Sequence, residues 1–371
     1  MTTQSYAVGE HPDMPPPASE VGVLGWLRKN LFSNWYYSLL TLLGLYILYL
    51  YVPPLVKWAF VDAVWGGEDR TACDAEGAGA CWTFINVRFT QFMYGFYPDE
   101  LQWRPNAAGL LLIALMVPLF IKSFKWKWLL GAFILLVYPF IAFVLIHGGY
   151  FGFELVETNK WGGLMLTLIL SAVGIVASLP IGIVLALGRR SSMPIVKSVC
   201  VVYIEFWRGV PLITVLFMSS VMLPLFFPEG TDFDKLARAM IGIIMFQSAY
   251  MAEVVRGGLQ AIPKGQYEAA ASLGLTYWKS MGLIILPQAL KLVIPGIVNT
   301  FIALFKDTTL VLIIGLFDLL AIIQQANSDP EWLGFDTEGY VFAGLVFWIF
   351  CFGMSRYSIA LEEKLHTGHK R

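Results

Sequence analysis

Long apolar segments dominate this sequence and limit what it can fold into. A helix that spans a bilayer needs about 20 mostly apolar residues, because the hydrocarbon interior holds no water to satisfy a free backbone group. Eight segments approach that length, the second and seventh being short; they are approximately 35–52, 107–121, 128–147, 162–188, 195–226, 236–255, 289–304 and 339–356. We therefore predict an all-α, polytopic membrane helical bundle with about eight transmembrane helices.

The composition supports this fold class and excludes others. Hydrophobic residues make up 57% of the 371 residues and charged residues only 14%, whereas soluble domains carry about 25% charged residues. The formal net charge is −1, which lacks the strong basic excess typical of nucleic-acid-binding domains. We expect a lipid bilayer, and no nucleic acid, as the partner of most of the surface.

The chain divides into three parts by composition. Residues 1–30 contain Pro15, Pro16 and Pro17 and no basic stretch followed by an apolar core, so they predict a disordered cytoplasmic tail and no cleaved signal peptide. Residues 31–160 hold three spans and a long outer loop. Residues 161–371 have short loops that carry motifs, and we place the working domain there.

Orientation follows from the basic residues of the short loops, which collect on the cytoplasmic side of bacterial membranes. In an eight-span arrangement Lys and Arg fall on one side, at 28–29, 122–127, 189–197, 256–279 and 364–371, while the opposite loops are acidic. Both termini are therefore expected in the cytoplasm.

Cysteine and histidine give no sign of a metal site. The four His residues show no metal-ligand spacing, and no Ser, His and acid grouping suggests a nucleophilic centre. Cys73 and Cys81 lie in the polar outer loop, where either a disulfide or two free thiols fits the sequence. We expect no metal and no catalytic residue.

Residues 266–287 form the most informative loop, on the predicted cytoplasmic side. Ala269, Ala270 and Ala271 favour a helix with little side-chain bulk, which another protein can approach closely. Gly274 can adopt the positive φ that turns the chain. The loop is predicted to form two short helices hinged at Gly274, and on physics alone an ordinary connector fits equally well.

The spacing of Glu268-Ala269-Ala270, Gly274 and Leu286-Pro287 resembles the EAA loop of bacterial ATP-binding-cassette (ABC) import permeases. Four other motifs, at 205–211, 252–258, 263–270 and 306–310, resemble the polar amino-acid branch of that family, with Val210 and Thr309 as mild departures. The long N-terminal part most resembles a membrane subunit of the general L-amino-acid importer.

This resemblance implies a type I importer core of five helices in the bacterial inner membrane, with the EAA coupling loop at about 257–287. It also implies a transport subunit rather than an enzyme. The implied partners are two ATPase subunits that bind ATP and Mg, a second permease, expected to be a paralogue, and a periplasmic amino-acid-binding protein. The chain itself contains no G-x-x-x-x-G-K-[ST] phosphate loop. The coupling residues would be Glu268, Ala269, Ala270, Leu273 and Gly274.

An ATP-independent secondary amino-acid transporter is the alternative. Such a carrier is expected to keep an ionisable relay at mid-membrane depth, and most charges here lie near span ends.

Polar residues inside the spans either line a path or hold helices together. Glu205 and Arg208, like Glu253 and Arg256, are three residues apart on a helix and fit a structural pair. The residues that could line a translocation path are Thr214, Ser219, Gln247, Tyr250, Asn299, Thr300, Lys306 and Asp307.

Overall fold

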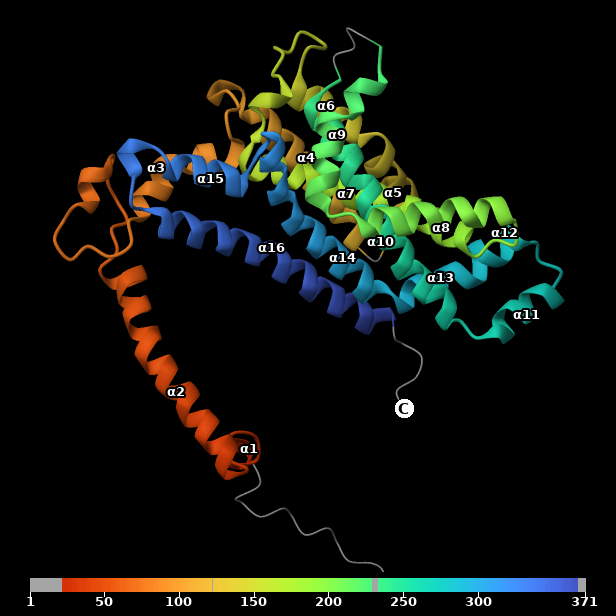
Figure 1. The fold of residues 1–371 in the computed structure, drawn as a ribbon, viewed down its shortest axis with the longest axis horizontal. Helices are drawn as coiled ribbons and strands as arrows, with labels where there is room; N and C mark the ends of the chain where they lie inside the picture. Colours follow the sequence, from red (N-terminus) through yellow and green to blue (C-terminus); the bar gives the residue numbers. More distant parts are fainter. Residues whose placement is uncertain (1–21, 122, 229–232, 366–371) are drawn as a thin grey trace, which may run out of the picture. The chain divides into compact units, whose positions relative to one another are not determined.

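The computed structural model describes residues 22–121, 123–228 and 233–365, and these form a helical membrane protein (Figure 1). Seven helices are long and apolar enough to cross a membrane, and a bent helix pair gives up to eight spans. The all-α bundle and the number of spans predicted from the sequence are confirmed. The chain splits into two compact units, unit 1 (1–67 and 71–83) and unit 2 (68–70 and 84–371).

Unit 1 contains helix α1 (Gly22–Asn30) and helix α2 (Trp35–Val56), which a short π-helix, η1 (Lys57–Val61), extends. The prediction of disorder over residues 1–30 is wrong for 22–30, because the apolar and basic pattern of this segment forms α1; residues 1–21 lie outside the described residues. No residue of α2 is buried. Helix α2 also carries no charged residue, which suits a helix surrounded by lipid.

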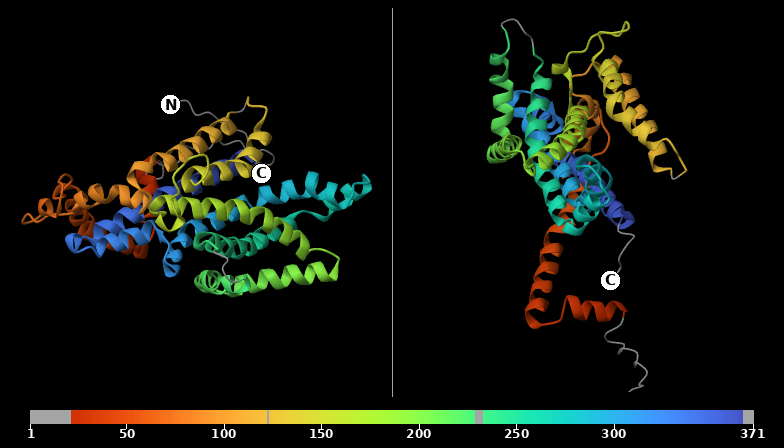
Figure 2. Two further views of the ribbon diagram at one scale, coloured as in Figure 1. Left: turned by 90° about the horizontal axis from the view of Figure 1, so that it is seen from above. Right: turned by 90° about the vertical axis from the view of Figure 1, so that its right-hand side faces the viewer.

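Unit 2 holds the remaining helices, and α3 begins two residues before it. Helices α3 (Trp82–Tyr94), α4 (Trp103–Phe120), α5 (Lys127–Leu136) and α6 (Tyr138–His147) come first. The rest are α7 (Gly163–Arg189), α8 (Pro194–Gly209), α9 (Leu212–Val221), α10 (Lys235–Ala261), α11 (Lys264–Ser272), α12 (Tyr277–Ser280), α13 (Leu286–Leu292), α14 (Ile294–Asp307), α15 (Leu319–Asn327) and α16 (Asp336–Leu365). A two-residue strand, β1 (Phe317–Asp318), pairs with Gly162 and Gly163. Figures 1 and 2 show α11 and α12 at one end of unit 2 and α15 at the other.

The fifth predicted span is not one straight helix, as the apolar run 195–226 had suggested. Helices α8 and α9 meet at an angle of 104°. Val210 is extended (φ −107°, ψ 134°) and Pro211 precedes α9. Proline disfavours helical backbone in the residue before it and offers no N–H, so the helix breaks there although both halves are apolar.

Helices α7 and α10 form the packing centre of unit 2. Small residues recur every four positions on α7, at 174, 178, 182 and 186, and all four are buried. A Cβ on Gly182 would lie 2.7 Å from the side chain of Met251 and 3.1 Å from the backbone N of Ala252. The absence of a side chain at Gly182 therefore lets the two helices approach closely.

Candidate functional site

The loop between α10 and α13 folds as two short helices joined at Gly274. Gly274 has φ +67°. Its N–H donates to the carbonyl of Ala271 at 2.9 Å, and the N–H of Leu275 donates to the carbonyl of Ala270 at 3.2 Å. This pair of bonds is the Schellman motif, which ends a helix with a left-handed residue and satisfies its last carbonyls. The structure thus places the predicted hinge at Gly274, between α11 and α12.

The hinged loop exposes several apolar side chains at its surface. Glu268, Ala269, Leu273 and Gly274 are exposed, whereas Ala270 is buried. Leu273 is 75% exposed and Trp278, just beyond the hinge, is 73% exposed. Exposed apolar side chains next to one another can serve as a contact surface for another protein. Leu273 is one of the predicted coupling residues, and Trp278 of α12, four residues after Gly274, is an exposed aromatic residue that the sequence analysis did not single out.

A clamp that the sequence did not predict ties α11 to the rest of unit 2. Arg190, directly after α7, donates to the hydroxyl of Tyr267 at 3.0 Å and to the carbonyl of Leu259 at 2.8 Å. The Tyr267 hydroxyl in turn donates to Leu259 at 3.0 Å, and the Arg190 guanidinium lies 5.5 Å from the centre of the Tyr267 ring. Gln288 of α13 adds a bond to Gln266 at 3.2 Å. These bonds join α11 to the C-terminal end of α7, to α10 and to α13.

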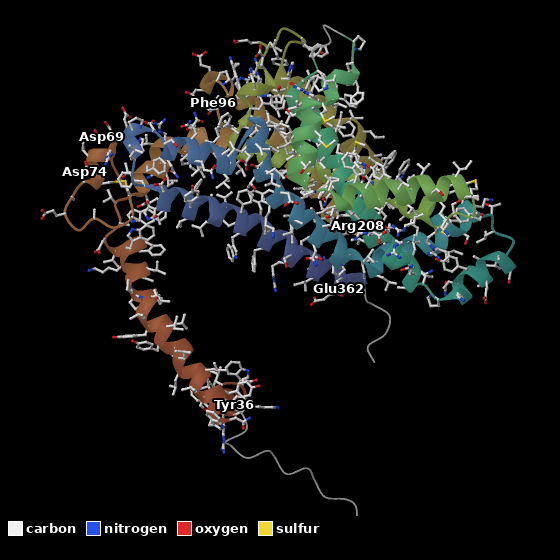
Figure 3. The ribbon with its side chains drawn as sticks, viewed as in Figure 1. Tyr36, Asp69, Asp74, Phe96, Arg208 and Glu362 are labelled. Atoms are coloured by element: carbon white, nitrogen blue, oxygen red, sulfur yellow. A yellow bond between two sulfur atoms is a disulfide. The ribbon has the colours of Figure 1, made fainter. Side chains whose placement is uncertain are left out.

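A cluster of charged side chains joins α7, α8 and α10. Glu253 lies 2.6 Å from Arg256, 3.0 Å from Arg189 and 3.6 Å from Arg208, the last labelled in Figure 3. Arg189 also pairs with Glu205 at 2.8 Å. The predicted pair of Glu253 and Arg256 forms, but Glu205 pairs with Arg189 rather than with Arg208. We read this cluster as structural, because one glutamate holds arginines of three helices together.

The residues predicted for a translocation path have different surroundings. Gln247 is buried and donates to the backbone carbonyl of Thr300 at 2.7 Å, so it ties α10 to α14. Ser219 and Thr300 donate to carbonyls of their own helices. Tyr250 is half-exposed, with the Arg208 guanidinium 5.8 Å from its ring centre. The remaining predicted residues are exposed or half-buried, namely Thr214, Asn299, Lys306 and Asp307.

In unit 1, Cys73 and Cys81 are joined by a disulfide. Within the described part of the chain, no group of three or more His, Cys, Asp or Glu residues is arranged to hold a metal ion.

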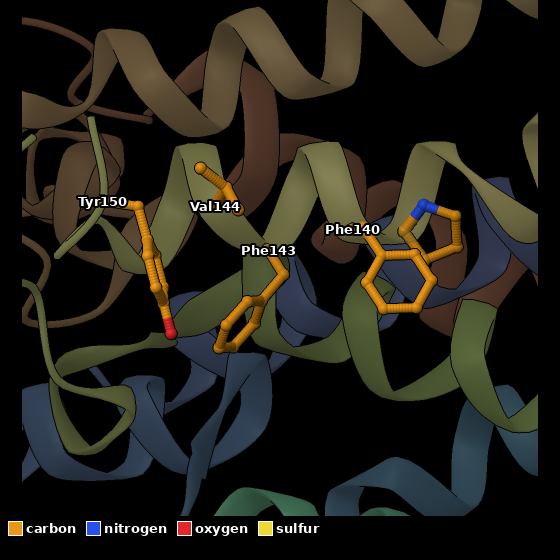
Figure 4. Close-up of a pocket in the computed structure, with 5 residues that line it drawn as sticks. Phe140, Phe143, Val144 and Tyr150 are labelled. Atoms are coloured by element: carbon orange, nitrogen blue, oxygen red, sulfur yellow. The ribbon is translucent and has the colours of Figure 1, made fainter.

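An apolar cavity of about 450 Å³ lies along α6, away from the hinged loop (Figure 4). Pro139, Phe140, Phe143, Val144 and Tyr150 line it. Among these residues only Tyr150 has a polar side-chain group, its hydroxyl. A cavity with so few polar groups fits a surface in contact with lipid better than it fits a binding site for a charged solute.

Comparison with known proteins assigns the family. The family model described as "Binding-protein-dependent transport system inner membrane component" matches residues 178–366, which include the charge cluster and the hinged loop. The Escherichia coli K12 protein named "Inner membrane amino-acid ABC transporter permease protein YhdY" is 60% identical over 358 residues, 96% of this chain and 97% of that protein. BztC of Rhodobacter capsulatus, a "glutamate/glutamine/aspartate/asparagine transport system permease protein", is 41% identical and covers 96% of both chains.

A shorter relative, the "glutamate/aspartate import permease protein GltK" of Escherichia coli, is 35% identical over half of this chain and 84% of its own length. These relatives are permease subunits, so the chain is a transport subunit and not an enzyme. Together, the matched segment and the near full-length likeness show that this multi-pass membrane protein belongs to the family of binding-protein-dependent transport system inner membrane components, the permeases of ABC importers.

Proposed function

We propose that this chain is the permease subunit of an ATP-driven importer of L-amino acids, of polar or general specificity. Its relative YhdY is named for amino-acid transport, and BztC is named for the transport of glutamate, glutamine, aspartate and asparagine. In this proposal a periplasmic binding protein delivers the amino acid. Two ATPase subunits bind ATP and Mg, and a second permease, a paralogue, completes the membrane part.

The observation that supports the proposal is the hinged loop of α11 and α12, most of whose side chains are exposed at the surface of unit 2. It exposes the small side chain of Ala269 and the large apolar side chains of Leu273 and Trp278 beside the turn at Gly274. A short helix with such a face suits docking into a groove of another protein. The clamp through Arg190 and Tyr267 would carry a push on α11 into α7 and α10.

We further propose that both termini and the hinged loop face the cytoplasm, and that residues 31–160 form an N-terminal extension to a core over 161–371. The basic residues of this loop, Lys264 and Lys279, support that orientation.

The test is amino-acid-stimulated ATP hydrolysis by the purified complex in lipid, with binding protein added. Gly274→Asp should abolish the stimulation while the chain still inserts into the membrane. The change adds a Cβ at φ +67° and places a negative charge at the negative end of the α11 dipole.

Gly265→Asp is the matched control. It introduces the same residue at the other end of α11, where no atom lies within 4 Å of the added Cβ and the dipole favours a carboxylate. Stimulation should survive in this variant. Normal stimulation in Gly274→Asp, or equal loss in both variants, would contradict coupling through the hinge.

A further inference from the structure

Helix α1 precedes the lipid-facing helix α2 and ends on two basic side chains. Its sequence, GVLGWLRKN, contains no acidic residue and has Arg28 and Lys29 in its last turn. We propose that α1 lies in the membrane–water interface and binds the headgroups of anionic lipids through Arg28 and Lys29. The proposal concerns a part of the chain before the family segment and does not depend on which solute is carried.

Helix α1 does not continue α2 but turns across its end. The right-hand view of Figure 2 shows this turn within unit 1. Asn34, at the junction, is extended (φ −138°, ψ 162°), and the hydroxyl of Thr41 in α2 donates to the carbonyl of Leu31 at 2.8 Å. Because α2 crosses the bilayer along its length, a helix turned across its end lies along the membrane surface.

The residues of α1 divide between two faces. Val23, Trp26 and Leu27 are three and four positions apart and share one face, whereas Arg28 and Lys29 lie away from it. Val23 is 75% exposed and Trp26 is 58% exposed. An apolar face beside a basic face is the pattern of a helix that inserts shallowly among lipid headgroups.

Aromatic residues at the start of α2 fix the depth of this junction. Trp35, Tyr36 and Tyr37 are exposed, and the rings of Tyr36 and Tyr37 lie 4.6 Å apart between centres. Figure 3 labels Tyr36 at the end of α2 that adjoins α1. Trp and Tyr at the end of a span lie at headgroup level, so the nearby basic side chains of α1 reach the lipid phosphates. A membrane surface therefore satisfies both faces of α1, because the apolar face contacts the lipid tails and the anionic headgroups attract Arg28 and Lys29.

The experiment places a spin label on Val23→Cys in a chain that also carries Cys200→Ala and Cys351→Ala. The complete transporter is reconstituted in vesicles of phosphatidylethanolamine and phosphatidylglycerol, and in vesicles of phosphatidylcholine alone. Collision of the label with oxygen, which enters the bilayer, is compared with collision with a water-soluble nickel chelate.

In the anionic vesicles we expect the label to collide mainly with oxygen. Arg28→Gln/Lys29→Gln should raise its collision rate with the nickel chelate several-fold, and phosphatidylcholine vesicles should have the same effect on the unmodified α1. Arg28→Lys/Lys29→Arg keeps both charges and should restore the membrane-bound signal, which separates loss of charge from misfolding. Lys125→Gln/Lys127→Gln makes an equal change in net charge elsewhere and should leave the label unaffected.

Three results would overturn the proposal. A label exposed to water in anionic vesicles would show that α1 leaves the membrane. A label in the membrane that ignores lipid charge and the Gln variants would show apolar insertion alone. A label shielded from both reagents would show that α1 packs against a protein subunit.

Discussion

Helices α2 and α10 both have the length of a membrane span, yet they are packed in opposite ways. Helix α2 carries no charged residue, and the rest of unit 1 buries none of its residues. Helix α10 carries Lys235, Arg238, Glu253 and Arg256, and 56% of its apolar stretch is buried. The less apolar helix is therefore the better buried one, the reverse of the trend in water-soluble proteins.

The difference has a physical reason in the solvent. Lipid tails are as apolar as leucine, so hydrophobicity does not drive one span against another; close packing and hydrogen bonds do. Helix α10 offers both, since it meets Gly182 of α7 at close range and bonds to α14 through Gln247. Helix α2 consists mainly of large apolar and aromatic residues, and lipid satisfies these equally well.

The strongest test of this comparison introduces the same side chain at a packed and an unpacked glycine. Gly182→Leu would place a Cβ 2.7 Å from Met251 and three further carbons between α7 and α10. Overpacking typically costs about 1–3 kcal/mol, and contact with the backbone N of Ala252 should push the loss above that range. Gly44→Leu in α2 meets nothing within 4 Å. We expect little folded Gly182→Leu protein and normal Gly44→Leu protein by gel filtration and thermal unfolding in detergent; equal yields would refute the comparison.

A second test removes the charge that holds the α7, α8 and α10 arginines together. Glu253, with 15% of its side chain exposed, contacts three arginines, and Glu205, at 55%, contacts one. Glu253→Gln removes the negative charge with which Arg208 and Arg256 pair, while Arg189 keeps Glu205, and should reduce the free energy of unfolding by about 3 kcal/mol. Glu205→Gln should change it by less than about 1 kcal/mol. Similar midpoints of thermal unfolding for the two variants would show that the deeper burial and the additional arginine partners of Glu253 do not affect stability.

The smallest expected effect is a dependence of stability on pH. It arises from a buried carboxyl group in unit 2, and α2 has no carboxyl group that could cause it. Asp318 caps α15 and is fully buried, and burial raises the pKa of its carboxyl from 3.8 to about 6, against the hydrogen bonds it accepts from the N–H groups of Ala321 and Leu320. The folded chain thus holds this proton more tightly than the unfolded chain. The stability contributed by the protonated form is complete below about pH 4 and is lost as the pH rises through 6, by at most about 3 kcal/mol.

The measurement is the difference in thermal stability between the unmodified chain and Asp318→Asn at pH 4, 5, 6 and 7. Asparagine can still cap the helix but does not titrate. We expect the unmodified chain to lose stability relative to the variant across this window. A difference that is constant with pH, or that changes in the opposite direction, would refute the assignment to Asp318.

Much of the fold could be predicted because the bilayer requires long apolar helices, and each helix satisfies its own backbone. All eight predicted segments correspond to helices that meet the length and composition of a span, once α8 and α9 are counted together. The bend between those two escaped prediction because hydropathy is equally high on both sides of Pro211. Helix α1 escaped because it is short and adjoins a proline-rich tail.

In the candidate site too, some features could be predicted from local sequence and others could not. The turn at Gly274 depends on hydrogen bonds among residues 269–275, so local sequence was sufficient to predict it. The clamp joins Arg190 to Tyr267, 77 residues apart, and no local pattern marks such a pair. Likewise the i,i+3 spacing predicted a pair of Glu205 and Arg208, but Glu205 pairs with Arg189 of α7 and Arg208 pairs with Glu253 of α10.

The sequence by itself determined which segments span the membrane, where the hinged loop lies and which residue turns it, because these depend on composition and on neighbours along the chain. Only the tertiary structure decided which spans of unit 2 pack against one another, how the charges pair, and how α11 is tied to α7. Those outcomes depend on the distance between helices, which glycines such as Gly182 permit and which no single segment of sequence specifies.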